Sequence, residues 1–283
     1  PQTTGLLLVH AINPWGMKYH CRVNANNVDL NRNFIYDGVF DPDFNPPYDT
    51  VSGTLNPRRA IQSLGVSNLI FNAELLWHLS RMGVIGFHNA SLPGQYRDPQ
   101  GLYYGGSNYQ EETHTLMQLL RQTLSAYDQI LHLDMHTGYG PRYQMSLVNS
   151  ALERGTSQEF VEKFYYPVVV AANPDEFYAL RGDLVDYVYI LWQQEFPQKR
   201  LFASAFEFGT LGNQYFGKVH CPVEMVHENR LRCHGAANDR IRAQVEHGFE
   251  ELFNPSAQDW KEKASADADQ AFEGIFNASG YFK

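Results

Sequence analysis

The chain has 283 residues, of which 43% are hydrophobic and 14% aromatic, so it is not a disordered protein and can form one large domain or two small ones. A formal net charge of −9 argues against nucleic acid or an anionic membrane as a partner, and no apolar run approaches the roughly 20 residues that span a bilayer. With no visible signal peptide, the three scattered cysteines predict reduced thiols in a cytoplasmic protein.

Apolar, strand-like runs alternate along the chain with amphipathic, helix-like stretches. The predicted strands are GLLLVHAI (5–12), GVIGFHNA (83–90), QILHLDMHT (129–137), RYQMSLVN (142–149) and RLFASAFEFGT (200–210). The predicted helices are 67–83, 107–124, 157–170, 183–196, 226–253 and 259–272. This alternation predicts an α/β fold with a mostly parallel sheet covered on both faces, and no repeat or linker divides residues 1–283.

Two irregular segments, 40–59 and 92–108, are long enough to be lids or binding loops. The second contains Tyr96, Tyr103 and Tyr104. One of these tyrosines could face a substrate, but packing of the loop explains them equally well.

The run LHLDMHTGYG places His132, Asp134 and His136 on one face of a strand, because alternate side chains of a strand share a face. His136 lies where the strand ends, so it can reach a cleft. It could bind a metal, with Asp134 as a second ligand or as the group that orients the imidazole. A histidine–aspartate pair satisfied inside the core is the equally weighted alternative.

In AFEFGT, Glu207 stands between two phenylalanines near the end of another predicted strand. A carboxylate in such surroundings is either paired or has a raised pKa, and a raised pKa suits a general base near neutral pH. A structural salt bridge is the alternative.

The stretch VNANNVDLNRNF (23–34) places Asn31 and Arg32 after an apolar run. Arginine holds a carboxylate through two parallel hydrogen bonds, so this pair suits the anionic end of a substrate. Arg22 is a second cation nearby that could stabilise negative charge on a carbonyl oxygen. Alternatively, Arg32 pairs with Asp29 and the asparagines form turns.

The motifs VDLNRNF, LDMHTG and FEFGT, in this order, resemble the zinc carboxypeptidase family, whose relatives include the succinylglutamate desuccinylase and aspartoacylase deacylases. The phrases VHAINPWG, GQYRDPQGLYYGG and DMHTGYGP resemble a bacterial subgroup of metallopeptidases or deacylases within it. The resemblance covers about residues 5–212. It implies a three-layer α/β/α sandwich with a mixed, mainly parallel sheet.

Carried over residue by residue, the resemblance implies that His136 is a zinc ligand and Glu207 the catalytic residue that activates the zinc-bound water. Asn31 and Arg32 match the pair that holds the substrate carboxylate. Arg22 matches the arginine that polarises the scissile carbonyl.

One departure concerns the metal. The family's first two ligands lie in an H-x-x-E sequence upstream of the NP-G turn, and no such sequence precedes that turn here. The one H-x-x-E is formed by His247 and Glu250, which we expect to be a coincidence on an exposed helix face. Either an upstream strand and ligand loop are missing from this sequence, which the start at Pro1 favours, or the protein is a relative with poor metal affinity.

The expected activity is zinc-dependent hydrolysis of an amide bond next to a free carboxylate, in a small peptide or an N-acyl amino acid. The alternative is a metal-poor, non-catalytic protein that binds carboxylates. A serine hydrolase is disfavoured because no G-x-S-x-G sequence is present.

Overall fold

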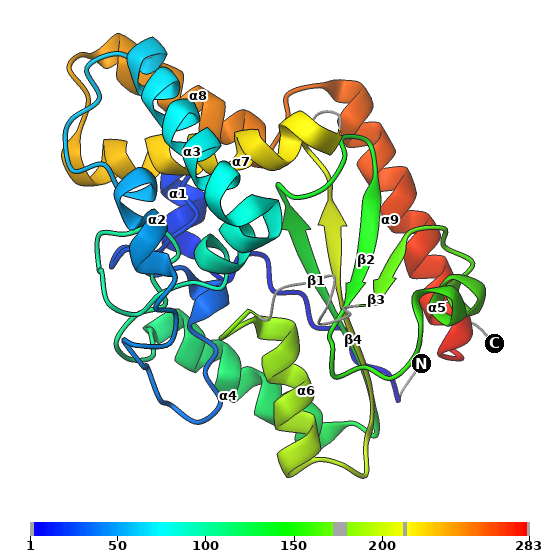
Figure 1. The fold of residues 1–283 in the computed structure, drawn as a ribbon. Helices are drawn as coiled ribbons and strands as arrows, with labels where there is room; N and C mark the ends of the chain where they lie inside the picture. Colours follow the sequence, from blue (N-terminus) through cyan, green and yellow to red (C-terminus); the bar gives the residue numbers. More distant parts are fainter. Residues whose placement is uncertain (1–2, 172–179, 212–213, 282–283) are drawn as a thin grey trace.

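The computed structural model describes residues 3–171, 180–211 and 214–281, which fold into a mixed α/β structure around a sheet (Figure 1). The strands described are β1 (Gln129–Thr137), β2 (Met145–Asn149), β3 (Val169–Ala171) and β4 (Arg200–Phe208). Their order in the sheet is β1-β4-β2-β3. β1 pairs with β4 in parallel, β4 with β2 antiparallel, and β2 with β3 in parallel.

Helices account for most of the remaining regular structure. In chain order they are α1 (Pro14–Tyr19), the 3₁₀ turn η1 (Leu30–Arg32), α2 (Tyr48–Leu55), α3 (Leu64–Ser91), α4 (Glu111–Ala126), α5 (Ser157–Phe164), α6 (Leu184–Glu195), α7 (Gln214–His234), α8 (Asp239–Phe253) and α9 (Gln258–Ala278). No helix among the described residues has an apolar stretch long enough to cross a membrane.

Side-chain caps fix where several helices begin. Ser63 accepts a hydrogen bond from the backbone of Val66 at the start of α3, and Asp183 accepts one from Asp186 at the start of α6. Thr156 and Glu159 form a reciprocal capping box at the start of α5. Each cap satisfies an N–H group that the first helical turn leaves without a partner.

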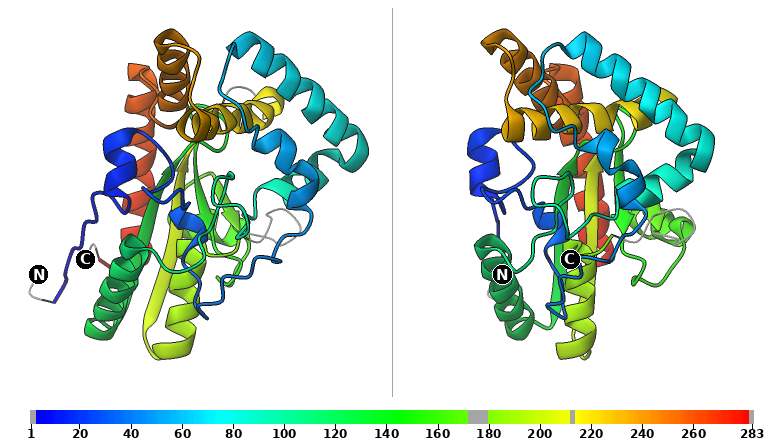
Figure 2. Two further views of the ribbon diagram at one scale, coloured as in Figure 1. Left: turned by 90° about the vertical axis from the view of Figure 1, so that its left-hand side faces the viewer. Right: turned by 60° about the vertical axis from the view of Figure 1, so that its left-hand side comes forward.

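Helices cover both faces of the sheet. On one face, α4 and α6 pack against it through a cluster that includes Leu120, Val188 and Ala203. On the other, α5 and α9 pack against it through Phe206 and Ile275, among others. A third apolar cluster joins α2, α3, α7 and α8 beyond one end of the sheet (Figures 1 and 2).

Three of the predicted strands are confirmed. The prediction 129–137 coincides with β1, 142–149 contains β2, and 200–210 contains β4. Most predicted helices are also found, although the C-terminal part of 157–170 forms β3 and 226–253 contains two helices. Gly235, with φ of 78°, and the N-cap Asn238 separate α7 from α8.

Two predicted strands are wrong. Residues 5–12 form no strand pairing, and Leu6 and Leu8 are 83% and 80% exposed. Residues 83–90 belong to α3, where Phe87 and Ala90 point inward at helical spacing. Gly83, the last residue of the predicted helix 67–83, instead interrupts the longer helix α3 with φ of 68° and ψ of 176°. A short apolar run has no periodicity that separates strand from helix, so the sequence pattern was ambiguous there.

Candidate functional site

The candidate site lies where β1 and β4 end. These strands run in parallel, and their register places His136 directly beside Glu207. Leu131 and Leu133 of β1 pack into the apolar cluster on the α9 side, so the alternate residues of β1, including Asp134 and His136, face the α6 side. His136 and Glu207, which come from two of the predicted strands, therefore meet at the ends of β1 and β4.

Direct contacts link three side chains at this site. The Nε2 atom of His136 lies 2.7 Å from Oδ2 of Asp134, and its Nδ1 atom lies 4.0 Å from Oε2 of Glu207. The backbone N–H of Tyr139 donates to Oε1 of Glu207 over 3.1 Å. Asp134 therefore orients the imidazole, so that Nδ1 is the ring atom facing Glu207.

The three groups shift one another's protonation. Burial opposes a charge on His136, but the carboxylates of Asp134 and Glu207 outweigh it and raise the pKa of His136 to about 9. Burial also works against the Asp134 carboxylate, yet the imidazolium beside it holds the pKa of Asp134 below its usual value. Burial raises the pKa of Glu207, although His136, the Tyr139 N–H and Arg22 act in the opposite direction.

Arg22 lies within electrostatic reach of this group, since its charge acts on Glu207. Its Nε donates to Oδ2 of Asp29 over 2.9 Å, and 27% of its side chain is exposed. The pairing corrects the alternative interpretation of the loop: Asp29 pairs with Arg22 rather than with Arg32. Asp29 also accepts a hydrogen bond from the backbone N–H of Asn31.

Asn31 and Arg32 lie on η1, and both side chains are engaged. The amide of Asn31 donates to Asp183 over 2.9 Å, and its oxygen accepts from the backbone N–H of Leu184. Arg32 is only 3% exposed, and its guanidinium donates to the carbonyl oxygens of Leu92 and Asn31. In this arrangement Arg32 ties η1 to the start of the 92–108 loop.

Asp183 is a member of the group that the sequence interpretation missed. It caps α6, accepts the hydrogen bond from Asn31, and its negative charge acts on both His132 and His136. In the sequence it is simply the first residue of the predicted helix 183–196. Asp183 follows His136 by 47 positions in the sequence, and no local pattern predicts that the two residues lie close together.

The tyrosines of the 92–108 loop are packing residues rather than parts of an exposed lid. Tyr96, Tyr103 and Tyr104 are all buried. The Tyr96 hydroxyl donates to the carbonyl oxygen of Arg32, and the Tyr103 ring lies 5.9 Å from the Arg22 guanidinium and 5.7 Å from that of Arg32. The loop therefore fixes the position of both arginines. The other predicted binding loop, 40–59, contains α2.

The described residues do not assemble a complete metal site. No group of three or more histidine, cysteine, aspartate and glutamate side chains among them is arranged to hold a metal ion. His136 offers one nitrogen, Nδ1. His247 and Glu250 lie on α8, where His247 is exposed and Glu250 approaches His20 at 3.6 Å, in line with the expected coincidence.

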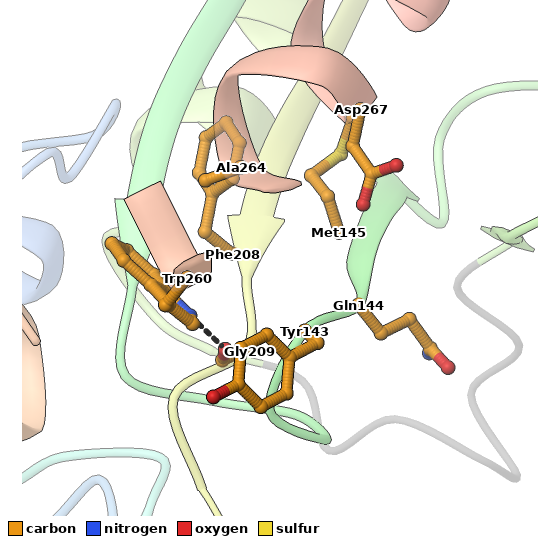
Figure 3. Close-up of a pocket in the computed structure, with 8 residues that line it drawn as sticks. All are labelled: Tyr143, Gln144, Met145, Phe208, Gly209, Trp260, Ala264 and Asp267. Atoms are coloured by element: carbon orange, nitrogen blue, oxygen red, sulfur yellow. Dashed lines mark hydrogen bonds between the residues drawn. The ribbon is translucent and has the colours of Figure 1, made fainter. Parts of the chain in front are cut away.

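A shallow surface depression lies elsewhere, between β2, the end of β4 and α9 (Figure 3). Phe208, Gly209 and Trp260 help to line it, and the Trp260 indole N–H donates to the Gly209 carbonyl oxygen over 2.8 Å. It includes none of the predicted site residues, so we do not assign the chemistry to it.

Comparison with known proteins places the chain in a family without naming a reaction. A family model described as "Protein of unknown function (DUF2817)" matches residues 1–267, so the chain belongs to this family. No curated protein and no solved structure matches the chain.

Proposed function

We propose that this member of the DUF2817 family is a hydrolase that cleaves an amide bond next to a free carboxylate. One observation supports the proposal above the others: His136 and Glu207 meet at the ends of adjacent parallel strands, with 4.0 Å between Nδ1 and Oε2. The ends of parallel strands are where α/β proteins bind ligands. The helices on both faces of the sheet also agree with the three-layer, carboxypeptidase-like sandwich that we propose for the fold.

Glu207 is the proposed general base. Its carboxyl is 16% exposed and has a pKa raised by burial, both of which suit a group that takes a proton from water near neutral pH. In the proposed reaction Glu207 accepts a proton from water as the water oxygen attacks the amide carbon. It then delivers that proton to the leaving amine as the carbon–nitrogen bond breaks.

In this proposal Arg22 and Arg32 each stabilise one negative charge, the first on the oxyanion and the second on the substrate carboxylate. Arg22, which acts electrostatically on Glu207 and is partly exposed, would stabilise the oxyanion. Asn31 and Arg32 would receive the substrate carboxylate. For this, Arg32 would exchange its hydrogen bonds to the Leu92 carbonyl oxygen for bonds to the substrate.

Zinc does not fit the described residues as a complete site. A catalytic zinc normally takes three protein ligands, and His136 supplies one. We therefore derive no step through a metal. The zinc requirement stays a prediction, to be tested by adding zinc to the protein or removing it with a chelator.

The incomplete ligand set favours one alternative, a protein that binds carboxylates without cleaving them. A substrate panel separates the two functions. Assayed with added zinc, dipeptides and N-acetyl amino acids should be hydrolysed, whereas matched C-terminal amides should not, because they lack the carboxylate.

The outcomes of this panel are distinct. Binding of the acids by calorimetry without turnover would support the carboxylate-binding function. If the protein neither binds nor hydrolyses any of these compounds, both proposed functions are contradicted.

A further inference from the structure

The outer face of helix α3 carries a long apolar stripe. The inner side chains of the helix, such as Phe71 and Leu75, are buried in the cluster with α2 and α7. The outer stripe consists of Val66, Leu69, Ile70, Ala73, Leu76, Trp77 and Ser80, all of them exposed. Figure 2 shows α3 at the periphery of the molecule, with this part of the chain away from the sheet.

The stripe has the spacing of a contact face. Its members recur at intervals of three and four residues, which places them on one side of the helix. Leu69, Leu76 and Trp77 are 70%, 67% and 55% exposed. A helix that is apolar on both its inner and outer faces is typical of one covered from both sides.

The apolar surface is large enough for an interface between proteins. With five large apolar side chains each more than half exposed, the stripe exposes on the order of several hundred Å², a substantial part of the about 800 Å² that each partner buries in a standard interface. Val84 and Ile85, which follow the break at Gly83 and are 42% and 76% exposed, extend the apolar surface. Single surface leucines need no explanation, but a contiguous patch of this size marks an interaction site.

The charges on α3 favour a second copy of the chain as the partner. Glu74 and Arg81 are the only acidic and basic side chains in the sequence of α3, apart from its histidines. They lie two turns apart on the same flank of the stripe. Under a two-fold axis near Trp77 and His78, an antiparallel copy of α3 would bring Glu74 beside the partner's Arg81, and Arg81 beside the partner's Glu74.

Other arrangements fit less well. In a parallel pair, each of these charges would face the apolar flank of the opposite helix. A membrane surface is disfavoured because the helix has no row of basic residues and the chain has a net charge of −9.

We propose that the outer stripe of α3 is the interface of a homodimer in which two copies of α3 pack antiparallel. The Arg81 guanidinium lies 5.2 Å from the centre of the Trp77 ring, which holds the indole on the same side of the helix as the charged flank. This inference concerns a surface away from His136 and Glu207 and does not depend on the proposed hydrolysis.

The first test is the mass of the full chain in solution, measured by sedimentation over a concentration series. The wild-type chain should be a dimer, and Leu69→Glu and Leu76→Glu should each raise the dimer dissociation constant at least about tenfold. Both positions are exposed, so the fold should survive, which circular dichroism checks. Val39→Glu, at a residue that is 53% exposed outside the stripe, is the matched control and should remain dimeric.

Charge reversal tests the antiparallel register. Glu74→Arg and Arg81→Glu should each weaken the dimer, and the double variant should restore it because the cross-interface pairs are re-formed with opposite sign. A wild-type chain that stays monomeric throughout the series would overturn the proposal. So would a dimer insensitive to both leucine variants, a double variant no tighter than the single ones, or a monomer that binds lipid vesicles through the stripe.

Discussion

The two faces of the β1–β4 strand pair differ sharply, although both are formed by alternating residues of the same two strands. One face presents Leu131, Leu133 and Phe206 to α9, and the side chains interlock in an apolar cluster. The other face presents Asp134, His136 and Glu207 to the α6 side. Burial opposes the charged form of each of these three side chains.

This difference separates stability from chemistry within one pair of strands. Replacing a buried ion pair by apolar residues is often neutral or stabilising, so the polar face is weak evidence of a contribution to folding. The apolar face stabilises the sheet, whereas the polar face holds the titratable groups of the proposed site in shifted protonation states. The following predictions test that division, from the largest expected effect on stability to the smallest.

Truncation on the apolar face should cost the most. Phe206 is fully buried and its ring centre lies 4.9 Å from that of Phe272, so Phe206→Ala should lower the free energy of unfolding by about 3–5 kcal/mol. Chemical denaturation measures this loss, and Phe206→Leu, which keeps most of the volume, should lose clearly less. A loss below about 1 kcal/mol for the alanine variant would contradict the assignment of this face.

The Asp134–His136 pair should make stability depend on pH. The pKa of His136 is raised from 6.5 to about 9, so in the metal-free protein its stabilising effect is full below pH 6.5 and is lost as the pH rises through 9. The expected loss is on the order of 3 kcal/mol. Denaturant unfolding curves from pH 6 to 9.5 for the wild type and Asp134→Asn measure this loss. If the free energy of unfolding falls equally with pH in both proteins, the Asp134–His136 pair is not its cause.

Asp186, in the first turn of α6, should be a destabilising charge. Burial and the nearby Asp183 raise the pKa of Asp186 to about 6, and the Ser150 hydroxyl donates to it. Asp186→Asn keeps an acceptor for Ser150 and removes the charge, so it should stabilise the protein at pH 7–8 by about 1–3 kcal/mol. The gain should vanish near pH 4, where the aspartate is protonated in the folded state, and a gain that persists there would exclude a charge effect.

Glu207→Gln should change stability least. The glutamine has nearly the same shape, can accept the hydrogen bond from the Tyr139 N–H, and removes a carboxylate that burial disfavours. We expect a change within about 1 kcal/mol in denaturant unfolding. A much larger loss would mean that Glu207 is a structural partner of His136 rather than a group kept for chemistry.

Sequence patterns predicted β1, β2, β4 and the shared face of Asp134 and His136, because these features depend on local alternation. β1 and β4 follow from apolar residues at every second position, and the same period places Asp134 and His136 on one face. Their meeting with Glu207 required only that two strands lie adjacent in parallel.

Longer-range features were not predictable in the same way. The apolar runs at 5–12 and 83–90 look alike, yet the first lies exposed without a strand partner and the second is helical. The pairing of Arg22 with Asp29, and the capping Asp183 beside His136, depend on how loops and helices pack. The hydrogen bond from Arg32 to the Leu92 carbonyl oxygen likewise joins residues that are 60 positions apart in the chain.

The most direct test of the central claim is the ratio of kcat/KM for the wild type and Glu207→Gln on the best N-acyl amino acid or dipeptide of the panel. We predict a loss of about 10²- to 10⁴-fold in the variant. Glu228→Gln is the matched control: it replaces another buried glutamate with a raised pKa, on α7 and paired with Arg232, and should retain full activity. A Glu207→Gln protein as active as the wild type, or a wild type that hydrolyses no member of the panel, would contradict the account.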